Sequence, residues 1–565
     1  MYVLGNPRVL SGLSWDGLRW AFETRYSGLW TPLAWLSHMT DVSVWGMQPG
    51  GHHLTSVLIH AASTLLLYGL LTYTTTDHWR AALVSLLFAI HPMHIESVAW
   101  VAERKDVLVA FFFILTLGCH ALRVRTGQRS WTVAMYLAAV AAVLAKPMAI
   151  SLPLALVLMD IWPLKRVGLA TEPLKKLMSL AVEKWPLFLL ASLLALNTLS
   201  EATDTGTRPV SADELFTLAQ RLQLAGLAYG YYIIKALWPF QLSFYYPANF
   251  ATPLWLSIVP PLLLVLALTV LWRQRSRYPA LLCGTLWYVI TLLPVSGIVQ
   301  IASYAYADRY SYLPHIGLFI GLAWSIPVPA NPRHKHLGAA LLGTLLVALL
   351  ALAHWQASHW KTSESLYSRA LSIDPTNRLA RLALAHTYVR KGDSAQASEL
   401  IQSLLVETGG PISAQAFLLA GDIEFFKGNR AQAAAGWQTA ARADTKYWRP
   451  HLRQGTLALE DAHPEQAIRH FLEADRLNPR NAEVLNNLGV AQVRLGNIAD
   501  AHKTYLRALE SDGRNPTTLL NLARSYERMG AQPDARRHYE ELQRIDPGNQ
   551  GARAGLMRLD GAPLR

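Results

Sequence analysis

A short segment dense in ionisable side chains, residues 91–106, lies between two apolar runs of the sequence. The segment reads HPMHIESVAWVAERKD, and the flanking apolar runs are residues 81–90 and 107–118. Ionisable groups at or near a membrane are costly to remove from water, so a dense cluster beside apolar runs indicates a functional site. The alternative is a hydrated loop between two membrane-spanning helices, although Pro92 and Trp100 favour an ordered segment.

Further polar segments border the apolar runs. Lys146 precedes Pro147 at the end of one run, and residues 304–312 combine acidic, basic and aromatic side chains. Lys and Arg bind phosphate, a carboxylate can take the proton of an incoming hydroxyl, and Tyr and Trp rings stack on sugars. This combination suits a substrate with a lipid tail and a phosphate head. The polar residues of residues 1–53 and of these segments include Asp16, Glu23, His38, Asp41, His52, His53, Lys146, Tyr304, Tyr306, Asp308, Arg309, Tyr310 and Tyr312.

Each of these groups also has a purely structural interpretation. Lys146 could simply extend its charge from a helix end towards the membrane surface. Asp308 and Arg309 could pair with each other. The spacing of His91, His94 and Glu96 could hold a divalent metal, but the sequence contains no zinc motif of fixed spacing. His52 and His53 are more typical of a membrane interface than of a ligand set.

The composition divides the chain into a membrane part and a polar part. Hydrophobic residues make up 52% of the 565 residues and charged residues 16%, but the apolar runs end near residue 355. We therefore expect an all-α protein with an outer loop at residues 1–53, a polytopic membrane domain at residues 54–355 and a soluble domain at residues 356–565. Cys119 and Cys283 lie in apolar runs, so neither a disulfide framework nor a cysteine metal site is indicated.

Basic residues between the apolar runs predict the orientation of the chain. The net charge of +13 does not require nucleic acid as a partner, because short basic joints between membrane spans explain it. These joints are expected on the cytoplasmic side of a bacterial inner membrane. Residues 1–53, 91–106 and 300–312, the Lys146–Pro147 corner and the C-terminal domain are then expected on the periplasmic side. The basic joints contain Arg123, Arg125, Arg129, Lys165, Arg166, Lys175, Lys176, Arg273, Arg275, Arg277, Arg333 and Lys335.

The apolar runs cannot all be single membrane crossings. A crossing needs about 20 residues, so the shorter runs must tilt or recruit flanking polar residues. If every run crossed once, the basic joints would not all face one side, and we expect residues 217–240 to lie on the outer face instead. The runs are residues 54–73, 81–91, 107–122, 131–145, 149–163, 185–199, 222–238, 254–272, 280–299, 313–328 and 337–354.

The polar part contains an internal repeat of 34 residues. Ala397, Ala433, Ala467, Ala501 and Ala535 are spaced 36, 34, 34 and 34 residues apart, and an aromatic residue follows each of the last four alanines by four positions. A glycine precedes four of these alanines by five positions, and Pro375, Pro479 and Pro547 recur at a matching phase. This is the signature of tetratricopeptide (TPR) repeats, so we expect an α-solenoid that begins with a half repeat at residues 363–375 and ends with a helix near residues 550–559.

Several motifs resemble those of TMTC proteins (transmembrane and TPR-containing) and their bacterial relatives. The resemblance covers essentially the whole chain and implies a membrane-embedded glycosyltransferase of the GT-C fold. Animal members are O-mannosyltransferases that use a dolichyl-phosphate sugar, so a bacterial member is expected to use an undecaprenyl-phosphate-linked sugar. The matching motifs are His91-Pro-x-His94-x-Glu96-x-Val-Ala-Trp100-x-x-x-Arg104-x-Asp106, Lys146-Pro147, Asp160-x-Trp162-Pro163-Leu164 and Ala307-Asp308-Arg309-Tyr310-Ser-Tyr312-Leu-Pro314.

The resemblance also implies a feature at the N-terminus that these residues do not contain. Family members begin with an additional membrane helix and an acidic pair, where the catalytic carboxylate is expected. The opening residues MYVLGNP resemble the stretch just after that pair, which suggests a start codon assigned too late or a degenerate copy. In addition, Thr31 stands where a histidine is expected.

The candidate site is therefore assigned from the residues that remain. Asp41, Glu96 and Asp106 are the candidate catalytic carboxylates. Arg104, Lys105, Lys146 and Arg309 are the candidate lipid-phosphate ligands. The candidate sugar or acceptor pocket contains His91, His94, Trp100, Asp308 and Tyr310. No metal ligand is assigned, and a divalent metal remains an option.

Two functions follow, from different classes. In the first, the protein moves a sugar from a polyprenyl-phosphate carrier to a hydroxyl acceptor, and the TPR groove binds the protein acceptor. In the second, the membrane part is an inactive anchor and the repeats assemble an envelope complex. A transporter is less favoured, because the ionisable groups gather at one face and no inverted repeat of broken helices is visible.

Overall fold

The computed structural model describes residues 3, 6–25, 30–167, 173–203, 216–299, 304–327, 331–406, 411–511 and 515–561. Residues 300–303 of the predicted outer loop lie outside this set. The described residues form helices and no strand, apart from an isolated bridge between Pro247 and Tyr304. The all-α class is confirmed. The chain divides into two compact units, residues 1–375 and 376–565.

The first unit contains the apolar helices. The helices in the N-terminal part of this unit are α1 (Pro7–Leu10), α2 (Trp15–Glu23), α3 (Pro32–Trp45), α4 (Pro49–Thr75), α5 (His78–Ile90), α6 (Ile95–Ala99), α7 (Arg104–Thr126), α8 (Arg129–Ala145) and α9 (Leu152–Ile161). Those that follow are α10 (Pro173–Glu183), α11 (Trp185–Thr203), α12 (Leu218–Leu237), α13 (Trp255–Arg273), α14 (Pro279–Leu292), α15 (Pro314–Ser325), α16 (Pro332–Ser358) and α17 (Ser363–Ile373).

Several of these helices can cross a membrane. Among the described residues, Pro49–Thr75, Val101–Thr126, Trp255–Arg273 and Pro332–Ser358 are long and apolar enough. Two bent pairs pass the same test, His78–Ile90 with Pro92–Ala99 and Lys175–Glu183 with Trp185–Thr198. Few residues of α13 and α16 are buried within the protein, which suits surfaces that face lipid. The protein is therefore a membrane protein by the length and composition of its helices. The helix α12, which contains the run expected not to cross, does not pass the test.

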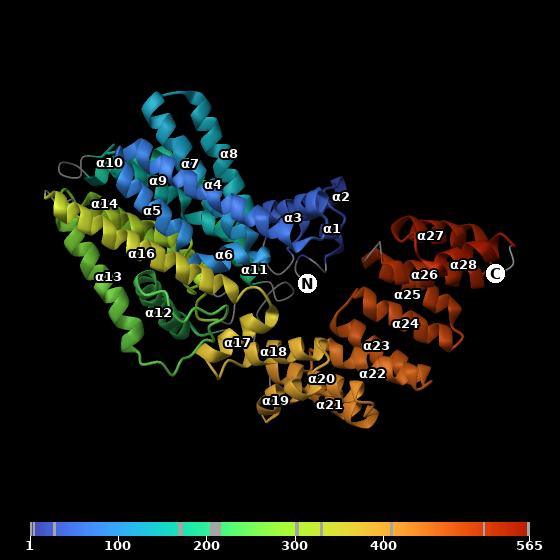
Figure 1. The fold of residues 1–565 in the computed structure, drawn as a ribbon. Helices are drawn as coiled ribbons and strands as arrows, with labels where there is room; N and C mark the ends of the chain where they lie inside the picture. The colour runs from blue at the N-terminus through green and yellow to red at the C-terminus, as the bar shows by residue number, and fades with distance from the viewer. Residues whose placement is uncertain are drawn as a thin grey trace. The chain divides into compact units, whose positions relative to one another are not determined.

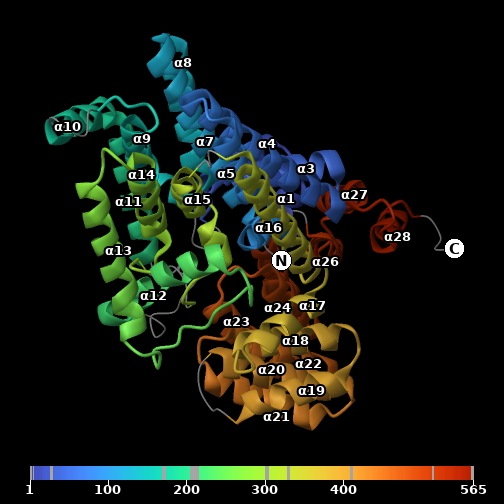
Figure 2. The same ribbon diagram turned by 60° about the vertical axis from the view of Figure 1, so that its left-hand side comes forward.

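The two ends of the first unit differ in chemistry. The turn between α7 and α8 and the turn between α13 and α14 lie at the upper left of Figure 1, and the basic joints gather there. Helix α6, which belongs to the acidic and basic segment 91–106, lies at the opposite end (Figures 1 and 2). The segments that the sequence assigns to the two sides of a membrane are thus at opposite ends of this unit.

Helix α17, which the sequence assigns to a half repeat at residues 363–375, also contacts segments of the first unit. The ring centroids of Tyr367 and Phe244 lie 5.3 Å apart. The guanidinium of Arg369 lies 4.7 Å from the ring centroid of Trp355 in α16. These contacts hold α17 against α16 and the loop that follows α12, so the division between the two compact units falls after Pro375.

The second unit is built from helical hairpins, as the 34-residue period predicts. Helix α28 (Gln550–Leu559) follows the hairpins, as predicted from the sequence. The helices of the second unit pair as α18 (Arg378–Arg390) with α19 (Ser394–Leu405), α20 (Pro411–Phe426) with α21 (Arg430–Ala443), α22 (Trp448–Glu460) with α23 (Pro464–Leu477), α24 (Ala482–Arg494) with α25 (Ile498–Ser511), and α26 (Pro516–Arg528) with α27 (Gln532–Ile545).

Small residues permit the close packing within each hairpin. A Cβ atom on Gly489 of α24 would lie 2.4 Å from a ring carbon of Tyr505 in α25, a distance that real structures do not tolerate. Tyr505 is itself buried. Gly489 and the aromatic residue of the repeat pattern, Tyr505, therefore form one complementary contact between the two helices.

The glycines in the turns of the hairpins are required by backbone conformation and not by close packing. Gly392, Gly428, Gly496 and Gly530 adopt φ values of +82°, +85°, +89° and +78°, where residues with a Cβ are disfavoured. Ala462 occupies the equivalent position between α22 and α23 with φ of +62°. The main-chain N–H of His463 donates to the Ala458 carbonyl at 2.8 Å, which closes this turn in the same way as its neighbours.

We expect Ala462→Gly to stabilise the repeat unit by about 1 kcal/mol, because it relieves the unfavourable left-handed conformation of an alanine. Thermal unfolding of the purified chain in detergent measures the change. Gly496→Ala is the matched control and should destabilise the same unit by a similar amount. An unchanged or lower Tm for Ala462→Gly would contradict the assignment of strain to this turn.

Candidate functional site

The segment 91–106 folds into a corner because proline interrupts its helix. Helix α5 ends at Ile90, and Pro92, which has no N–H to donate, opens a 3-10 turn, Pro92–His94. The axis of Pro92–Ala99 is bent by 51° from that of α5. A second 3-10 turn, Val101–Glu103, then leads into α7. The corner brings charged residues that are near in sequence into the interior at different angles.

The first group of charges, called here the ion-pair cluster, consists of Glu96, Glu103, Lys105, Asp106, Lys146 and Arg309. They come from α6, the second 3-10 turn, the first turn of α7, the end of α8 and the 3-10 turn Asp308–Ser311. All six residues are buried. Three carboxylates therefore balance three cations, which is what burial of charge requires.

Glu103 lies at the centre of the ion-pair cluster. Its carboxylate oxygens lie 3.3 Å from Lys105 Nζ, 3.6 Å from Arg309 Nε and 3.8 Å from Lys146 Nζ. The Oε2 atom of Glu103 is buried and has no hydrogen-bond partner. Glu103 thus faces all three cations. Its distances to them are longer than those of the ion pairs that Glu96 and Asp106 make.

The other two carboxylates are held more tightly. Glu96 accepts the main-chain N–H of Arg309 at 2.9 Å and also pairs with the Arg309 guanidinium. Asp106 pairs with Lys146 and accepts a hydrogen bond from Ser97 Oγ at 3.3 Å. Lys146 and Arg309 therefore each pair with a buried carboxylate, and Lys146 does not extend to the membrane surface. The structure pairs Arg309 with Glu96 and Glu103 and not with Asp308.

Aromatic rings enclose the guanidinium of Arg309. It lies 5.2 Å from the ring centroid of Trp100, 5.2 Å from that of Tyr304 and 5.1 Å from that of Tyr310. Arg309 also donates to the Tyr304 hydroxyl at 2.6 Å. Lys146 Nζ lies 5.4 Å from the ring centroid of Tyr310. Arg309 and Lys146 thus contact carboxylates and also aromatic rings, whose π faces can stabilise cations.

Asp308 points into a separate tyrosine environment. Its Oδ1 atom accepts hydrogen bonds from the hydroxyls of Tyr231 and Tyr246, each at 2.9 Å. Burial, and then the negative charge of Glu96, raise the pKa of Asp308 well above its ordinary value. Asp308 therefore fixes the loop 304–312 against α12 beside the ion-pair cluster.

A second group, called here the Asp41 cluster, contains Asp41, Arg104, His52, Thr55, Ser37, Ser56 and His38. Arg104 is fully buried and makes four hydrogen bonds, including one of 2.7 Å to Asp41 Oδ2 and one of 2.6 Å to the His52 carbonyl. Asp41 also accepts from Thr55 Oγ1 at 2.8 Å. This cluster joins α3, α4 and α7.

The predicted site residues thus fall into four places, the first of which is the tyrosine environment of Asp308 described above. Glu96, Asp106, Lys105, Lys146 and Arg309 meet in the ion-pair cluster, with Trp100 and Tyr310 against Arg309. Asp41 and Arg104 form the separate Asp41 cluster, where Arg104 is occupied by protein groups. His91 and His94 are buried beside His315 at the corner.

The prediction did not assign roles to Glu103, Tyr231, Tyr246, Tyr304 or His315. Glu103 and Tyr304 lie in segments that the sequence analysis had singled out, so charge density and aromatic content were the available signals. His315 directly follows Pro314 of a recognised motif. Tyr231 and Tyr246 carry no such signal, because only the packing of α12 brings them to Asp308.

A further buried network lies elsewhere in the first unit and involves Asp160 of the Asp160-x-Trp162-Pro163 motif. His120 Nε2 lies 2.8 Å from Asp160 Oδ1, and Arg166 donates to the same oxygen at 3.1 Å. Lys184 pairs with Asp160 Oδ2. This motif therefore connects α7, α9 and the start of α11 through one carboxylate.

Comparisons with known proteins relate both parts of the chain to characterised groups. Residues 354–422, 452–501 and 488–550 match family descriptions that read "Tetratricopeptide repeat". The chain is 26% identical over 406 residues to Protein O-mannosyl-transferase TMTC4 of Homo sapiens, which covers 62% of this chain and 54% of that protein. It is 35% identical over 103 residues to Protein O-mannosyl-transferase TMTC2 of Homo sapiens, which covers 18% of this chain and 12% of that protein.

The chain is a distant relative of the TMTC O-mannosyltransferases. It spans about half the length of the human TMTC4 protein. Solved structures similar to the chain include Pseudomonas aeruginosa PilF, with 21% identity, a TM-score of 0.30 and coverage of 33% of this chain and 83% of that one. They also include YrrB, a TPR protein with an unusual peptide-binding site, with 17% identity, a TM-score of 0.28 and coverage of 34% and 99%.

We expect Arg104→Gln to lower the free energy of unfolding by about 3–5 kcal/mol, because it leaves the carboxylate of Asp41 buried without its charge partner. The double variant Arg104→Gln/Asp41→Asn should lose less than the sum of the single variants. Thermal unfolding in detergent measures both effects. Arg430→Gln is the control, since its ion pair with Glu460 is exposed and contributes less than about 1 kcal/mol. Equal losses for Arg104→Gln and Arg430→Gln would refute a structural role for the Asp41 cluster.

The Asp41 cluster also predicts a pH dependence. Burial, and then the charge of Arg104, lower the pKa of His38 to about 3. The unfolded chain takes up this proton near pH 6.5, so the folded state loses stability as the pH falls from 6.5 towards 3, by about 1.4 kcal/mol at about pH 5.5. We expect His38→Gln to reduce the slope of Tm against pH below 6.5. A slope identical to that of the unmodified chain would show that His38 does not contribute.

Proposed function

We propose that this protein is a membrane glycosyltransferase that moves a sugar, mannose in the first instance, from a polyprenyl-phosphate carrier to a hydroxyl group of a protein. The observation that carries the proposal is the ion-pair cluster at one end of the apolar unit, in a chain similar over 406 residues to a protein named as an O-mannosyltransferase. The cluster supplies cations for a phosphate and carboxylates for a hydroxyl, and apolar helices beside it suit a lipid carrier.

The phosphate of the carrier would bind among Lys105, Lys146 and Arg309. These cations come from three separate elements and converge on the single carboxylate of Glu103. The phosphodiester of the donor has one negative charge and two non-bridging oxygen atoms, with which it can replace Glu103 as their partner. The rings of Trp100 and Tyr310 would then remain available to stack on the sugar.

This exchange of partners would also prepare the base. A carboxylate next to three cations is a weak base, and it becomes more basic when the cations turn to another anion. Glu103 would then accept the proton of the acceptor hydroxyl. The acceptor oxygen would form a bond to the anomeric carbon while the bond from that carbon to the phosphate oxygen breaks, with inversion. The polyprenyl phosphate would leave with the electron pair, stabilised by Lys146 and Arg309.

This proposal changes the roles predicted from the sequence. Glu96 and Asp106 would position Arg309 and Lys146, to which they are bound. Asp41 would act on the fold through Arg104 and not on substrate. His91 and His94 would lie behind the site. The TPR unit would present the protein acceptor, because stacked repeats form extended binding surfaces. Basic joints on the cytoplasmic side would place the ion-pair cluster on the periplasmic side of a bacterial inner membrane.

A second candidate function is a membrane-anchored TPR scaffold without transferase activity. The observation that favours it is the saturation of the cluster, in which each of the three cations contacts a carboxylate of the protein. In a scaffold this network would only hold the helices together, and neither phosphate nor hydroxyl would enter it.

Transfer in proteoliposomes distinguishes the two functions. The purified chain is reconstituted with radiolabelled polyprenyl-phosphate mannose and a membrane-protein extract, and label in protein that is released by β-elimination is counted. We expect Glu103→Gln to reduce transfer by about 10²-fold or more, because it removes the base. Arg309→Lys should also reduce transfer, since an ammonium cannot replace the fork of a guanidinium.

The control is Arg277→Gln, an exposed basic residue at the opposite end of the unit, which should leave transfer unchanged. Comparable Tm values separate a chemical effect from unfolding. The enzyme proposal fails if the unmodified chain transfers no label, or if Glu103→Gln and Arg277→Gln are equally active. Either result would favour the scaffold.

A further inference from the structure

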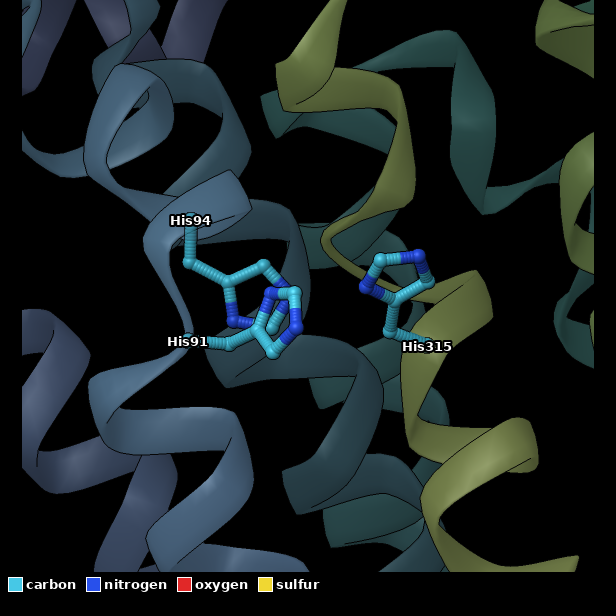
Figure 3. Close-up of side chains that lie close together, drawn as sticks. All are labelled: His91, His94 and His315. Atoms are coloured by element: carbon cyan, nitrogen blue, oxygen red, sulfur yellow. The ribbon is translucent and has the colours of Figure 1, made fainter. Parts of the chain in front are cut away.

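Three histidines meet at the corner between α5 and α6. His91 and His94 belong to the corner, and His315 lies in the first turn of α15. Their ring centroids form a nearly equilateral triangle with sides of 5.6, 5.3 and 5.6 Å. Figure 3 shows the three rings gathered between the two segments. All three residues are at most 1% exposed, so this triangle lies inside the protein.

Each imidazole binds a backbone carbonyl through one nitrogen. His91 Nε2 lies 3.2 Å from the Ala236 carbonyl, His94 Nδ1 lies 2.8 Å from the Phe88 carbonyl, and His315 Nε2 lies 3.2 Å from the Tyr232 carbonyl. A carbonyl only accepts hydrogen bonds, so these nitrogens carry the proton. The other nitrogen of each neutral ring is therefore a lone-pair donor.

The three lone pairs have almost no partners in the protein. His94 Nε2 and His315 Nδ1 are buried and have no hydrogen-bond partner. His91 Nδ1 receives only a long contact of 3.4 Å from the main-chain N–H of Met93. Buried acceptors without partners are unfavourable, which indicates that a ligand belongs at this position.

The arrangement matches the way in which proteins hold a metal through histidine. Histidine ligands usually donate their second N–H to a carbonyl or carboxylate, which fixes the ring and its tautomer. One ligand atom from each of these histidines lies within 4.8 Å of the others. Zinc–nitrogen bonds of about 2.0–2.1 Å require separations of about 3.4 Å, so the rings would turn towards one another when the ion binds.

We propose that His91, His94 and His315 bind a single zinc-class transition-metal cation. Three neutral imidazoles suit Zn²⁺, and a fourth position remains for water. The ion would tie the corner, and with it the helix that carries Glu96, to α15. Its role would therefore be structural, and the proposal does not depend on sugar transfer.

A second trio of possible ligands, His38, Asp41 and His52, serves as a comparison. Its carboxylate is already paired with Arg104, whose nitrogen lies 2.7 Å from Asp41 Oδ2. A guanidinium this close repels an added cation. The set of His91, His94 and His315, called here the His91 trio, contains no such charge. We therefore expect a metal ion to bind the His91 trio in preference to the second trio.

Metal analysis of the purified chain tests the proposal. After purification without metal-affinity chromatography, elemental analysis should find close to one zinc ion per chain, because the three ligands are buried and gathered by the fold. His94→Ala and His315→Ala should each lose that metal, whereas His38→Ala, equally buried, should retain it. Stripping the unmodified chain with a chelator should lower its Tm, and Zn²⁺ should restore it.

Co²⁺ provides a second measurement that does not depend on the variants. The stripped chain loaded with Co²⁺ should show the visible absorption bands of tetrahedral nitrogen ligation. The proposal is overturned if the unmodified chain holds no metal after exposure to Zn²⁺ or Co²⁺, or if His38→Ala loses the metal while His94→Ala and His315→Ala keep it. Since metal content is measured without substrate, a failure of glycosyl transfer leaves this test intact.

Discussion

The burial of charge among apolar helices is the constraint on which the first unit depends. Removing a carboxylate or an ammonium from water costs several kcal/mol unless an opposite charge is in contact. The ion-pair cluster meets this requirement with three carboxylates and three cations drawn from five separate segments. Charge balance therefore joins the corner, the ends of α7 and α8 and the loop before α15, because none of them can bury its charge alone.

The same constraint explains why neighbouring residues serve different structures. Arg104 and Lys105 are adjacent, yet Arg104 points to Asp41 and Lys105 to Glu103. Successive residues of a helix project about 100° apart, so the first turn of α7 reaches two groups of partners at once. A planar guanidinium with several donors suits the closed Asp41 cluster, and a single ammonium suits a site where partners exchange.

The buried histidines contrast with the ion pairs and have a different meaning. In the ion-pair cluster every charged group has an opposite charge in contact, although Glu103 Oε2 accepts no hydrogen bond, so charge is balanced without a ligand and function requires that one partner be replaced. At the His91 trio the protein supplies one partner for each ring and leaves the opposite lone pairs unmatched. The unpartnered histidine lone pairs indicate a permanently bound ion. The charged groups of the ion-pair cluster, which already have partners, suit a substrate that binds and leaves.

Local chemistry made the repeat unit predictable from the sequence alone. Each hairpin is specified within about 34 residues, by small residues opposite aromatic rings and by a turn residue with positive φ, so a periodic pattern suffices. The helical class and the apolar runs also follow from neighbours in the chain, and Pro92 indicated an ordered segment, although the bend there is seen only in the structure. The sequence likewise identified Lys146, Asp106, Glu96 and Arg309 as residues of one polar region, since each follows or precedes an apolar run.

Only the tertiary structure decided which of these charges meet. Arg309 and Glu96 are 213 positions apart, and the choice of Glu96 over the adjacent Asp308 depends on the direction in which a short 3-10 turn projects its side chains. The assignment of Arg104 to Asp41, the tyrosines around Asp308 and the approach of His315 to His91 likewise depend on packing between helices. Such contacts have no period and no fixed spacing, because geometry in three dimensions selects them, and so the sequence by itself determined the parts of the site but not their pairing.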